Sequence, residues 1–309
     1  MADYITKSPV LFLIFNRPDV TAVVFEQIRK VKPARLYVAA DGPRSDKENE
    51  QMLCCEARAI STKVDWDCEV KTLFRDENLG CKYAVSSGIN WFFENEEEGI
   101  ILEDDCLPST DFFIFCDSML QKYRFDTRIR HIGGSNFQMG TQWGSDSYYF
   151  SNLTHVWGWA SWRRAWKDYD VELSKYSGLN IERSFNNIFS NAILTDIWMS
   201  IFNKLLANKI NTWDYQWAIT NFLNNGLSII PNMNLISNIG FGANATHTIN
   251  SRDKYSKINI DQLKEISHPI IKLAEKEADF FTLNNEYRIR RIAEKKILRK
   301  LKFWKKYSN

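Results

Sequence analysis

Three consecutive carboxylates, Glu103, Asp104 and Asp105, directly follow a short apolar run at residues 99–102. Such a run is typical of a buried strand, and carboxylates at its end are unfavourable unless they bind a cation or face a cleft. Mg²⁺ and Mn²⁺ take one or two carboxylates together with phosphate oxygens and water. The triplet therefore predicts a site for a divalent cation and a diphosphate; the alternative is a solvated acidic turn.

Two more polar residues follow predicted strands. Arg17 lies just past residues 10–15, where its guanidinium is suited to a phosphate or a base carbonyl. The alternative is an arginine at a helix start, which the helix dipole slightly disfavours. Asp41 closes residues 36–40 before a Gly-Pro turn. It is a candidate hydrogen-bond acceptor for a nucleobase or a ribose, or a turn-forming aspartate.

Asp214 and His247 are candidates in the second half of the chain. Asp214 stands among aromatic residues, which indicates a desolvated carboxylate suited to act as a general base. The alternative is a helix N-cap. His247 is one of four histidines and is a candidate metal or diphosphate ligand, or a surface-loop histidine.

A tryptophan-rich segment spans residues 157–166. Aromatic faces pack on the apolar faces of sugars, so the segment is a candidate platform for a sugar. Most aromatic side chains belong to a hydrophobic core, so we expect both roles in this segment. Its members are Trp157, Trp159, Trp162 and Trp166.

The elements that position these residues alternate between strand and helix. Strands are predicted at residues 10–15, 36–40, 69–74 and 99–102, with helices at 18–31, 46–60 and 80–94. Alternation of this kind indicates βαβ units and a parallel sheet, whose ligands bind beyond the carboxyl ends of the strands. Beyond residue 106 the pattern is less regular. It predicts helices at 111–123, 188–208 and 213–224 and strands at 130–133 and 227–230.

The composition is that of a globular protein. Of 309 residues, 44% are hydrophobic and 25% are charged, which excludes a disordered or disulfide-scaffold protein. The net charge of +2 gives no reason to expect a nucleic-acid partner. The six cysteines have no metal-binding spacing, and we see neither a signal peptide nor an apolar run long enough to span a membrane. We therefore expect a cytoplasmic protein.

The last residues carry most of the positive charge. Residues 285–309 contain ten lysines and arginines and two glutamates, and their apolar residues recur at helical spacing. This pattern predicts a basic amphipathic helix. Such a helix can lie on an anionic membrane surface, or it can pack its apolar stripe on the body of the protein.

Taken together, these motifs resemble GT-A glycosyltransferases. The closer resemblance is to the family of eukaryotic N-acetylglucosaminyltransferase I and the bacterial polysaccharide glycosyltransferases related to it. The resemblance covers residues 8–250, and its most specific part is the acidic triplet followed by Asp-Phe-Phe at 111–113. The matching segments are residues 15–18, 41–42, 78–80, 101–113, 158–159, 213–214 and 240–242.

The resemblance implies an α/β fold of the GT-A type, which is a Rossmann-like nucleotide-diphospho-sugar transferase fold. It implies a mostly parallel central sheet and a C-terminal helical extension. Residues 1–250 would form the glycosyltransferase domain, with residues 1–106 as the nucleotide-binding half and 107–250 as the acceptor and donor-sugar half. Residues 251–309 would form the basic helical extension.

The resemblance also implies roles at the donor site. Arg17 would contact the diphosphate of a UDP-sugar, and Asp41 would hydrogen-bond the uracil. Glu103 and Asp104 would shape the ribose and sugar end, and Asp105 would ligate Mn²⁺ or Mg²⁺.

The remaining implied roles concern the metal, the substrate and the chemistry. His247 would be a second metal contact, and Trp159 and Trp213 would contact substrate. Asp214 would deprotonate the acceptor hydroxyl, which implies an inverting displacement. A dTDP- or GDP-sugar donor stays open if Asp41 does not read uracil.

The function implied is transfer of a sugar from a UDP-sugar to a glycan or lipid-linked glycan in bacterial surface polysaccharide synthesis, such as lipopolysaccharide or capsule. The lack of an N-terminal membrane anchor argues against secretory glycan processing, and the basic tail would reach the inner face of the cytoplasmic membrane. Three alternatives remain. A nucleotidyltransferase needs a Gly-rich loop after the first strand, which this chain lacks. A non-catalytic nucleotide- or sugar-binding module and a metal-dependent hydrolase are the others.

Overall fold

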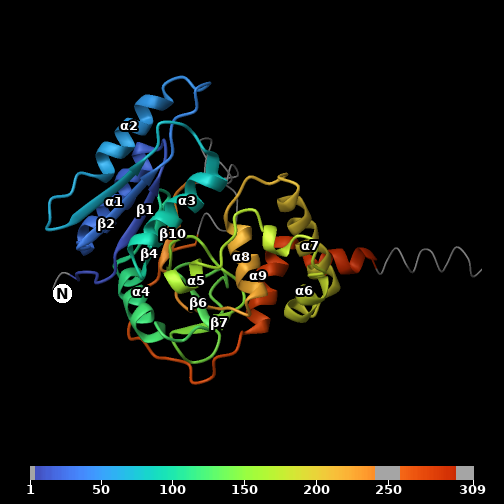
Figure 1. The fold of residues 1–309 in the computed structure, drawn as a ribbon. Helices are drawn as coiled ribbons and strands as arrows, with labels where there is room; N and C mark the ends of the chain where they lie inside the picture. Colours follow the sequence, from blue (N-terminus) through green and yellow to red (C-terminus); the bar gives the residue numbers. More distant parts are fainter. Residues whose placement is uncertain (1–3, 241–257, 297–309) are drawn as a thin grey trace, which may run out of the picture.

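The apolar runs predicted as strands form the parallel half of an eight-stranded sheet in the computed structural model, which describes residues 4–240 and 258–296 (Figure 1). The strand order is β3-β2-β1-β4-β8-β6-β9-β7. The strands are β1 (Val10–Ile14), β2 (Arg35–Ala40), β3 (Glu69–Phe74), β4 (Glu98–Glu103), β6 (Ile129–Gly133), β7 (Tyr148–Ser151), β8 (Trp159–Trp162) and β9 (Leu227–Pro231). A separate antiparallel pair joins β5 (Cys106–Pro108) to β10 (Ile236–Asn238).

Strands β1 to β4 pair in parallel and are connected by α1 (Pro18–Val31), α2 (Glu50–Ser61) and α3 (Gly80–Asn95). The prediction for α1 is confirmed to the residue, because proline favours the first turn of a helix. Helix α2 starts at Glu50 and not at residue 46. Alternate side chains of β1 enter different cores, as the period of a strand requires.

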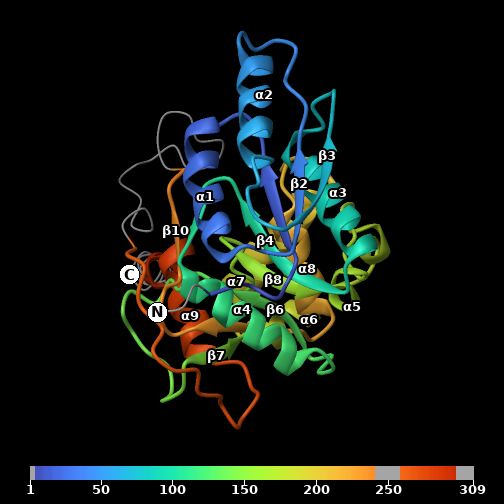
Figure 2. The same cartoon turned by 90° about the vertical axis from the view of Figure 1, so that its left-hand side faces the viewer.

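Helices cover both faces of the sheet. Helices α1 and α2 lie side by side on one face, together with α4 (Thr110–Tyr123) (Figure 2). Helices α3, α5 (Arg163–Trp166) and α8 (Asp214–Leu223) cover the other face. The predicted fold class, α/β with a mostly parallel central sheet, is confirmed.

The sheet continues across the boundary predicted at residue 106. Strand β8 inserts between β4 and β6 and is antiparallel to both, whereas β6 and β9 are parallel. The two predicted halves therefore share one sheet and one set of cores, and they are not separate layers.

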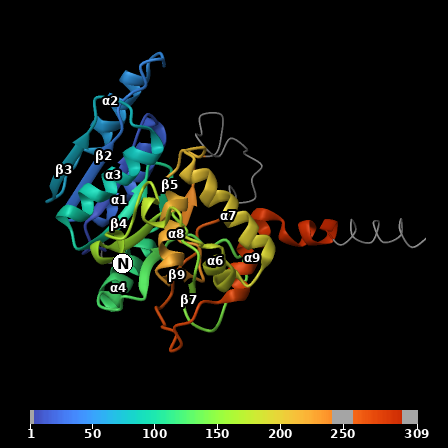
Figure 3. The ribbon, with the colours of Figure 1, turned by 45° about the vertical axis from the view of Figure 1, so that its right-hand side comes forward.

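A helical lobe lies beside the sheet (Figure 3). It contains a short 3-10 turn (Ser174–Tyr176), α6 (Glu182–Phe189) and α7 (Ala192–Leu206). The single helix predicted over residues 188–208 is wrong. Ser190 adopts a left-handed conformation with φ of 49°, which ends the first helix. The Asn191 side chain then caps α7 by accepting hydrogen bonds from the backbone N–H groups of Ile193 and Leu194.

The predicted helical extension over residues 251–309 also differs from the structure. Residues 251–257 lie outside the described residues, and residues 258–275 contain no helix but run along the body. There the Leu263 N–H donates to Asp111 at 2.9 Å and the Asn234 N–H donates to Asp261 at 3.0 Å. Helix α9 (Lys276–Tyr287) then packs against β7 and β9 through Ala278. This part of the chain belongs to the body because its polar groups bond to it.

The single basic helix predicted over residues 285–309 is interrupted. Arg288 is left-handed and ends α9, and a second helix begins at Ile289, whose side chain is buried against the helical lobe. In residues 289–296 the apolar stripe thus packs on the body at Ile289, while residues 297–309 lie outside the described residues. No helix in the described part of the chain is long and apolar enough to cross a bilayer.

Candidate active site

The carboxyl ends of β1, β2 and β4 meet at one edge of the sheet. Parallel pairing sets Ile14 opposite Ala40 and Leu13 opposite Glu103, so the three strands end at one level. Arg17, Asp41 and the acidic triplet therefore gather at this edge, as their positions after strands predict.

Arg17 holds two members of the triplet. Its Nη2 donates to Asp104 Oδ1 and lies 3.0 Å from Asp105 Oδ2. Asp104 is buried, and its second oxygen, Oδ2, has no hydrogen-bond partner among the described residues. Burial raises the pKa of Asp104 to about 6 even though Arg17 opposes the shift. The guanidinium of Arg17 is thus shared by two carboxylates, and Asp104 Oδ2 has no donor among the described residues.

Glu103 connects the triplet to Asp214. Burial raises the pKa of Glu103 to about 8, and the negative charges of Asp105, Asp104 and Asp214 add to the shift. Glu103 therefore lies within the field of three other carboxylates, which the positive charge of Arg17 offsets only in part. Such an arrangement attracts a multivalent cation, because a cation removes the repulsion among them.

Cys81, at the start of α3, lies among the same charges. Burial, together with the negative charges of Glu103, Asp214 and Asp41, raises the pKa of its thiol to about 12. Sequence reasoning missed Cys81, because a cysteine in the first turn of a helix carries no motif. Only the meeting of α3, β4 and α8 reveals its position.

Asp214 is the first residue of α8, and Trp213 stands at the N-cap position. Its Oδ1 accepts hydrogen bonds from the Thr212 hydroxyl and from the Tyr215 N–H, the latter at 2.9 Å. The hydrogen bonds that described residues make to Asp214 all use Oδ1, which leaves Oδ2 available to accept a proton.

Trp159 and Trp213 do not present open faces to a substrate. Trp159 is fully buried, with its ring stacked between Trp213 at 5.7 Å and His131 at 5.2 Å. Trp213 is buried as well, and its carbonyl accepts from the Tyr169 hydroxyl at 3.1 Å. The substrate contact predicted for these two residues does not fit this packing. Their packing holds the first turn of α8 in place, and Asp214 is the first residue of that helix.

The carboxylate of Asp41 is fully hydrogen-bonded to neighbouring groups of the protein. Its oxygens accept from the backbone N–H groups of Gly42, Leu79 and Gly80 at 2.9 to 3.0 Å and from the Asn78 side chain at 2.9 Å. Four donors match the four acceptor sites of a carboxylate. Asp41 thus ties β2 to the start of α3, and the predicted contact with uracil does not fit this geometry.

Gly240 brings a distant part of the chain to Asp105. Pairing of β10 with β5 continues through a 2.8 Å hydrogen bond from the Ile239 N–H to the Asp105 carbonyl. A Cβ on Gly240 would lie 2.3 Å from Asp105 Oδ2 and 2.8 Å from Arg17 Nη1, so a side chain at this position would displace Asp105 and Arg17. His247, predicted as a metal ligand, lies outside the described residues.

The donor set at this edge fits Mg²⁺ or Mn²⁺. Its atoms are carboxylate oxygens, and Asp104 Oδ2 is a buried acceptor in need of a positive partner. Within residues 4–240 and 258–296, no group of three or more His, Cys, Asp or Glu side chains is arranged to hold a metal ion by itself. Mg²⁺ commonly uses only one or two protein carboxylates, with phosphate and water for the rest. The edge therefore suits a cation that arrives with a diphosphate.

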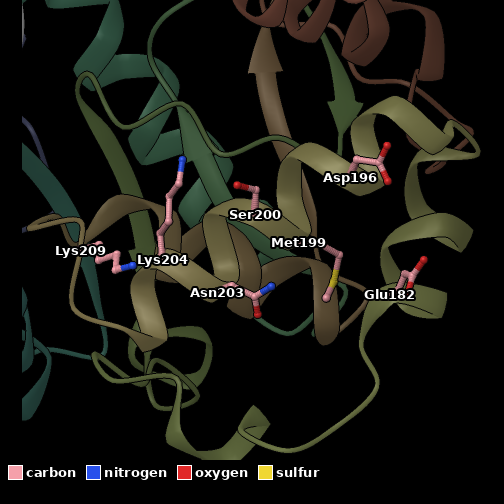
Figure 4. Close-up of a pocket in the computed structure, with 7 residues that line it drawn as sticks. All are labelled: Glu182, Asp196, Met199, Ser200, Asn203, Lys204 and Lys209. Atoms are coloured by element: carbon pink, nitrogen blue, oxygen red, sulfur yellow. The ribbon is translucent and has the colours of Figure 1, made fainter. Parts of the chain in front are cut away.

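Two surface hollows lie away from this edge. One of about 510 Å³ lies on α6 and α7, where Asp196 and Glu182 stand apart from Lys204 and Lys209 (Figure 4). The other, of about 820 Å³, is lined by α1, α4 and Trp66. In Figure 4 the labelled side chains do not converge on a common point. Neither hollow contains a member of the acidic triplet, so we place the candidate site at the sheet edge.

Comparisons with known proteins give fold resemblances at low identity. No protein-family model matches the chain, and no curated protein matches it. Among solved structures, GalNAc-T7 with UDP, GalNAc and Mn²⁺ is 11% identical with a TM-score of 0.46, over 80% of this chain and 46% of that one. UDP-glucose pyrophosphorylase complexed with UDP-glucose is 12% identical with a TM-score of 0.35, over 73% and 90% of the two chains.

A third structure is 4-diphosphocytidyl-2C-methyl-D-erythritol synthase from Anaerococcus prevotii. It is 9% identical with a TM-score of 0.35, over 60% of this chain and 85% of that one. Every one of these TM-scores is below 0.5, so no argument about the fold or the site of this chain rests on them. No role of any residue is carried over from these structures.

Proposed function

We propose that this protein is a glycosyltransferase that moves a sugar from a UDP-sugar to a hydroxyl group of a glycan or lipid-linked glycan, with inversion and with the help of a divalent cation. A dTDP- or GDP-sugar stays open as the donor, because Asp41 is bonded within the protein. The observation that supports the proposal is the acidic triplet at the sheet edge, where Arg17 pairs with Asp104 and Asp105 and the charge of Asp214 reaches Glu103. Among the described residues, neither Asp104 Oδ2 nor Asp214 Oδ2 has a hydrogen-bond partner.

The donor end of the proposal uses Arg17 and the triplet. Asp105 is the residue that we propose holds Mn²⁺ or Mg²⁺, and a bound divalent cation neutralises charge on the departing diphosphate. Arg17 forms ion pairs with both Asp104 and Asp105. Its guanidinium would thus be a second positive group, beside the cation, that can contact the phosphates of the donor.

The acceptor end uses Asp214. The acceptor oxygen attacks the anomeric carbon, the bond from that carbon to the diphosphate oxygen breaks, and UDP leaves with the electron pair. Asp214 Oδ2 takes the acceptor proton, while hydrogen bonds to Oδ1 from Thr212 and Tyr215 keep the carboxylate oriented. One displacement gives inversion at the anomeric carbon.

The stereochemistry of slow donor hydrolysis tests this proposal without knowledge of the acceptor. Water can stand in for the acceptor hydroxyl, so the sugar released first from an α-linked UDP-sugar should be the β-anomer, as followed by proton NMR. Release of the α-anomer first would refute an inverting displacement. Absence of hydrolysis together with tight nucleotide binding would favour the alternative, a non-catalytic nucleotide- or sugar-binding module.

The biological setting is part of the proposal. Transfer to a lipid-linked glycan fits synthesis of a bacterial surface polysaccharide on the inner face of the cytoplasmic membrane. The support is the basic composition of residues 285–309. Five cationic side chains among residues 288–296 are exposed, and they belong to Arg288, Arg290, Arg291, Lys295 and Lys296.

A further inference from the structure

Four large apolar side chains stand in solvent on the side of the body where residues 258–275 run. Their exposed fractions are 89% for Phe125, 96% for Ile270, 70% for Ile271 and 73% for Leu273. The loop that connects to α9 is the lowest part of the molecule in both Figure 1 and Figure 2. We call these four side chains the apolar tip. Exposure of this degree means that they project from the surface and line no groove.

The tip is one surface although its residues are far apart in sequence. Lys272, between Ile271 and Leu273, forms an ion pair of 3.0 Å with Asp126, next to Phe125. The same ammonium lies 5.2 Å from the centre of the Tyr123 ring. Leu273 is followed by Ala274, which bridges to Phe150 at the sheet edge. These contacts fix the loop beside the end of α4.

The charged residues beside the tip carry a small excess of positive charge. Four are cationic and three are acidic, and Glu98 and Asp126 pair with three of the cations. The cations are Lys122, Arg124, Arg128 and Lys272, and the third carboxylate is that of Glu275. Lys122 is exposed and forms no ion pair with a described residue. Large apolar side chains with lysine and arginine beside them are the pattern of proteins that enter the interface of an anionic bilayer.

A protein partner fits these observations less well. A stable protein interface buries about 800 Å² on each side and takes roughly 20 to 30 residues. Four projecting side chains with a charged rim are much smaller than that. Insertion into the headgroup region, by contrast, needs only a few apolar side chains together with cations.

We infer that the apolar tip is a membrane-docking surface that inserts Phe125, Ile270, Ile271 and Leu273 into an anionic lipid surface. This surface is distinct from the basic residues 285–309 and does not depend on the proposed function. Docking there would hold the body of the protein against the bilayer at a second place, and the candidate active site would keep one orientation relative to the lipid.

Flotation with vesicles tests the inference on the full chain. Vesicles of phosphatidylcholine are compared with vesicles that also contain phosphatidylglycerol, at low and at high salt. We expect the protein to float with the anionic vesicles. Replacement of all four tip residues by serine should weaken binding by about tenfold or more, because each residue loses apolar area that the bilayer would cover. Lys122→Gln should weaken binding less, and only at low salt.

Leu179→Ser is the matched control, because Leu179 is 60% exposed but lies in the helical lobe region away from the tip. It should float like the unchanged protein. A two-residue variant, Ile270→Ser with Ile271→Ser, covers the case in which the fourfold variant does not fold, and it should also bind more weakly.

Three results would overturn the inference. The first is equal flotation of the tip variants and the unchanged protein, which would assign any binding to the basic tail. The second is absence of flotation by the unchanged protein. The third is a dimer that becomes a monomer when the tip is changed, without any binding to vesicles, which would make the tip a contact between copies of this chain.

Discussion

Asp117 and the pair Asp104 and Asp105 have opposite surroundings. Asp117, on α4, is buried and receives four hydrogen bonds from the N-terminal segment: from the hydroxyls of Tyr4 and Thr6 and from the N–H groups of Lys7 and Ser8, at 2.5 to 3.0 Å. At the sheet edge, Asp104 and Asp105 share one arginine, and Asp104 Oδ2 has no partner in the described part of the chain.

The difference separates a structural role from a functional one. A buried carboxylate with a full set of donors stabilises the fold, because each donor replaces a lost contact with water. Carboxylates that repel each other and lack donors destabilise the fold. Such groups are typical of sites where a ligand supplies the missing partners.

The largest expected effect is a loss of turnover when a carboxylate of the functional group, Asp214, is changed. Asp214→Asn should lower the rate of sugar transfer or donor hydrolysis by about 10² to 10⁴-fold, the range in which a general base contributes. Nucleotide binding should persist, because the change keeps the shape and the hydrogen bonds to Oδ1. Asp196→Asn, an exposed aspartate on α7, is the matched control. Unchanged turnover in Asp214→Asn would remove this residue as the base.

The next effect concerns the structural aspartate. Asp117→Ala should lower the free energy of unfolding by roughly 3 kcal/mol, because it leaves buried hydroxyl and N–H donors without an acceptor. Urea denaturation followed by circular dichroism measures this change. A loss below about 1 kcal/mol would mean that water replaces the carboxylate and that the N-terminal segment is not held by Asp117.

A pH effect of intermediate size follows from His131. Burial lowers the pKa of its imidazole to about 3, and Trp217 Nε1 donates to Nδ1 at 3.2 Å while Nε2 faces the His155 carbonyl at 3.0 Å. The folded state thus prefers the neutral ring. This stability is fully present above the unfolded pKa near 6.5 and is lost as the pH falls from there toward 3.

Between pH 7 and pH 5 the unchanged protein should therefore lose about 2 kcal/mol of stability through His131. His131→Gln retains a donor and an acceptor but does not titrate, so its stability should change less over the same interval. Urea titrations at the two pH values test this. Parallel losses in both proteins would show that His131 does not contribute.

The smallest effect contrasts directly with Asp117. Asp104→Asn removes a negative charge from the crowded edge and leaves Arg17 paired with Asp105. In a metal-free buffer we expect the free energy of unfolding to stay the same or to rise by up to about 1 kcal/mol. A loss as large as that of Asp117→Ala would place Asp104 among the structural aspartates.

The sequence predicted the first half of the fold well because its signals are local. Proline at position 18 starts α1, and buried strands read as apolar runs bounded by polar residues. Arg17, Asp41 and the triplet could be placed at one edge because parallel strands end together. The break at Ser190 could not be predicted, since a serine in a left-handed conformation has no sequence signature.

The roles of individual side chains depend on contacts between distant segments. The sequence leaves Asp41 open between a nucleotide contact and a turn, and the turn before α3 supplies its donors. It leaves Trp159 open between a sugar platform and the core, and the packing of α8 places Trp159 in the core. Ile270 and Ile271 fall in the segment that the sequence assigns to the helical extension over residues 251–309. Its exposure follows only from the path of residues 258–275 along the body.

The central claim is that the carboxylates at the sheet edge, which have too few hydrogen-bond donors, bind a nucleotide diphosphate together with a divalent cation. Titration calorimetry with UDP, GDP, dTDP and CMP, each with and without Mn²⁺, tests it most directly, with Asp105→Ala as the site variant and Asp196→Ala as its control. We predict that UDP binds, that binding requires Mn²⁺, and that Asp105→Ala abolishes it. Absence of binding for every nucleotide with Mn²⁺ present, or Mn²⁺-dependent binding that survives in Asp105→Ala, would contradict this account of the site.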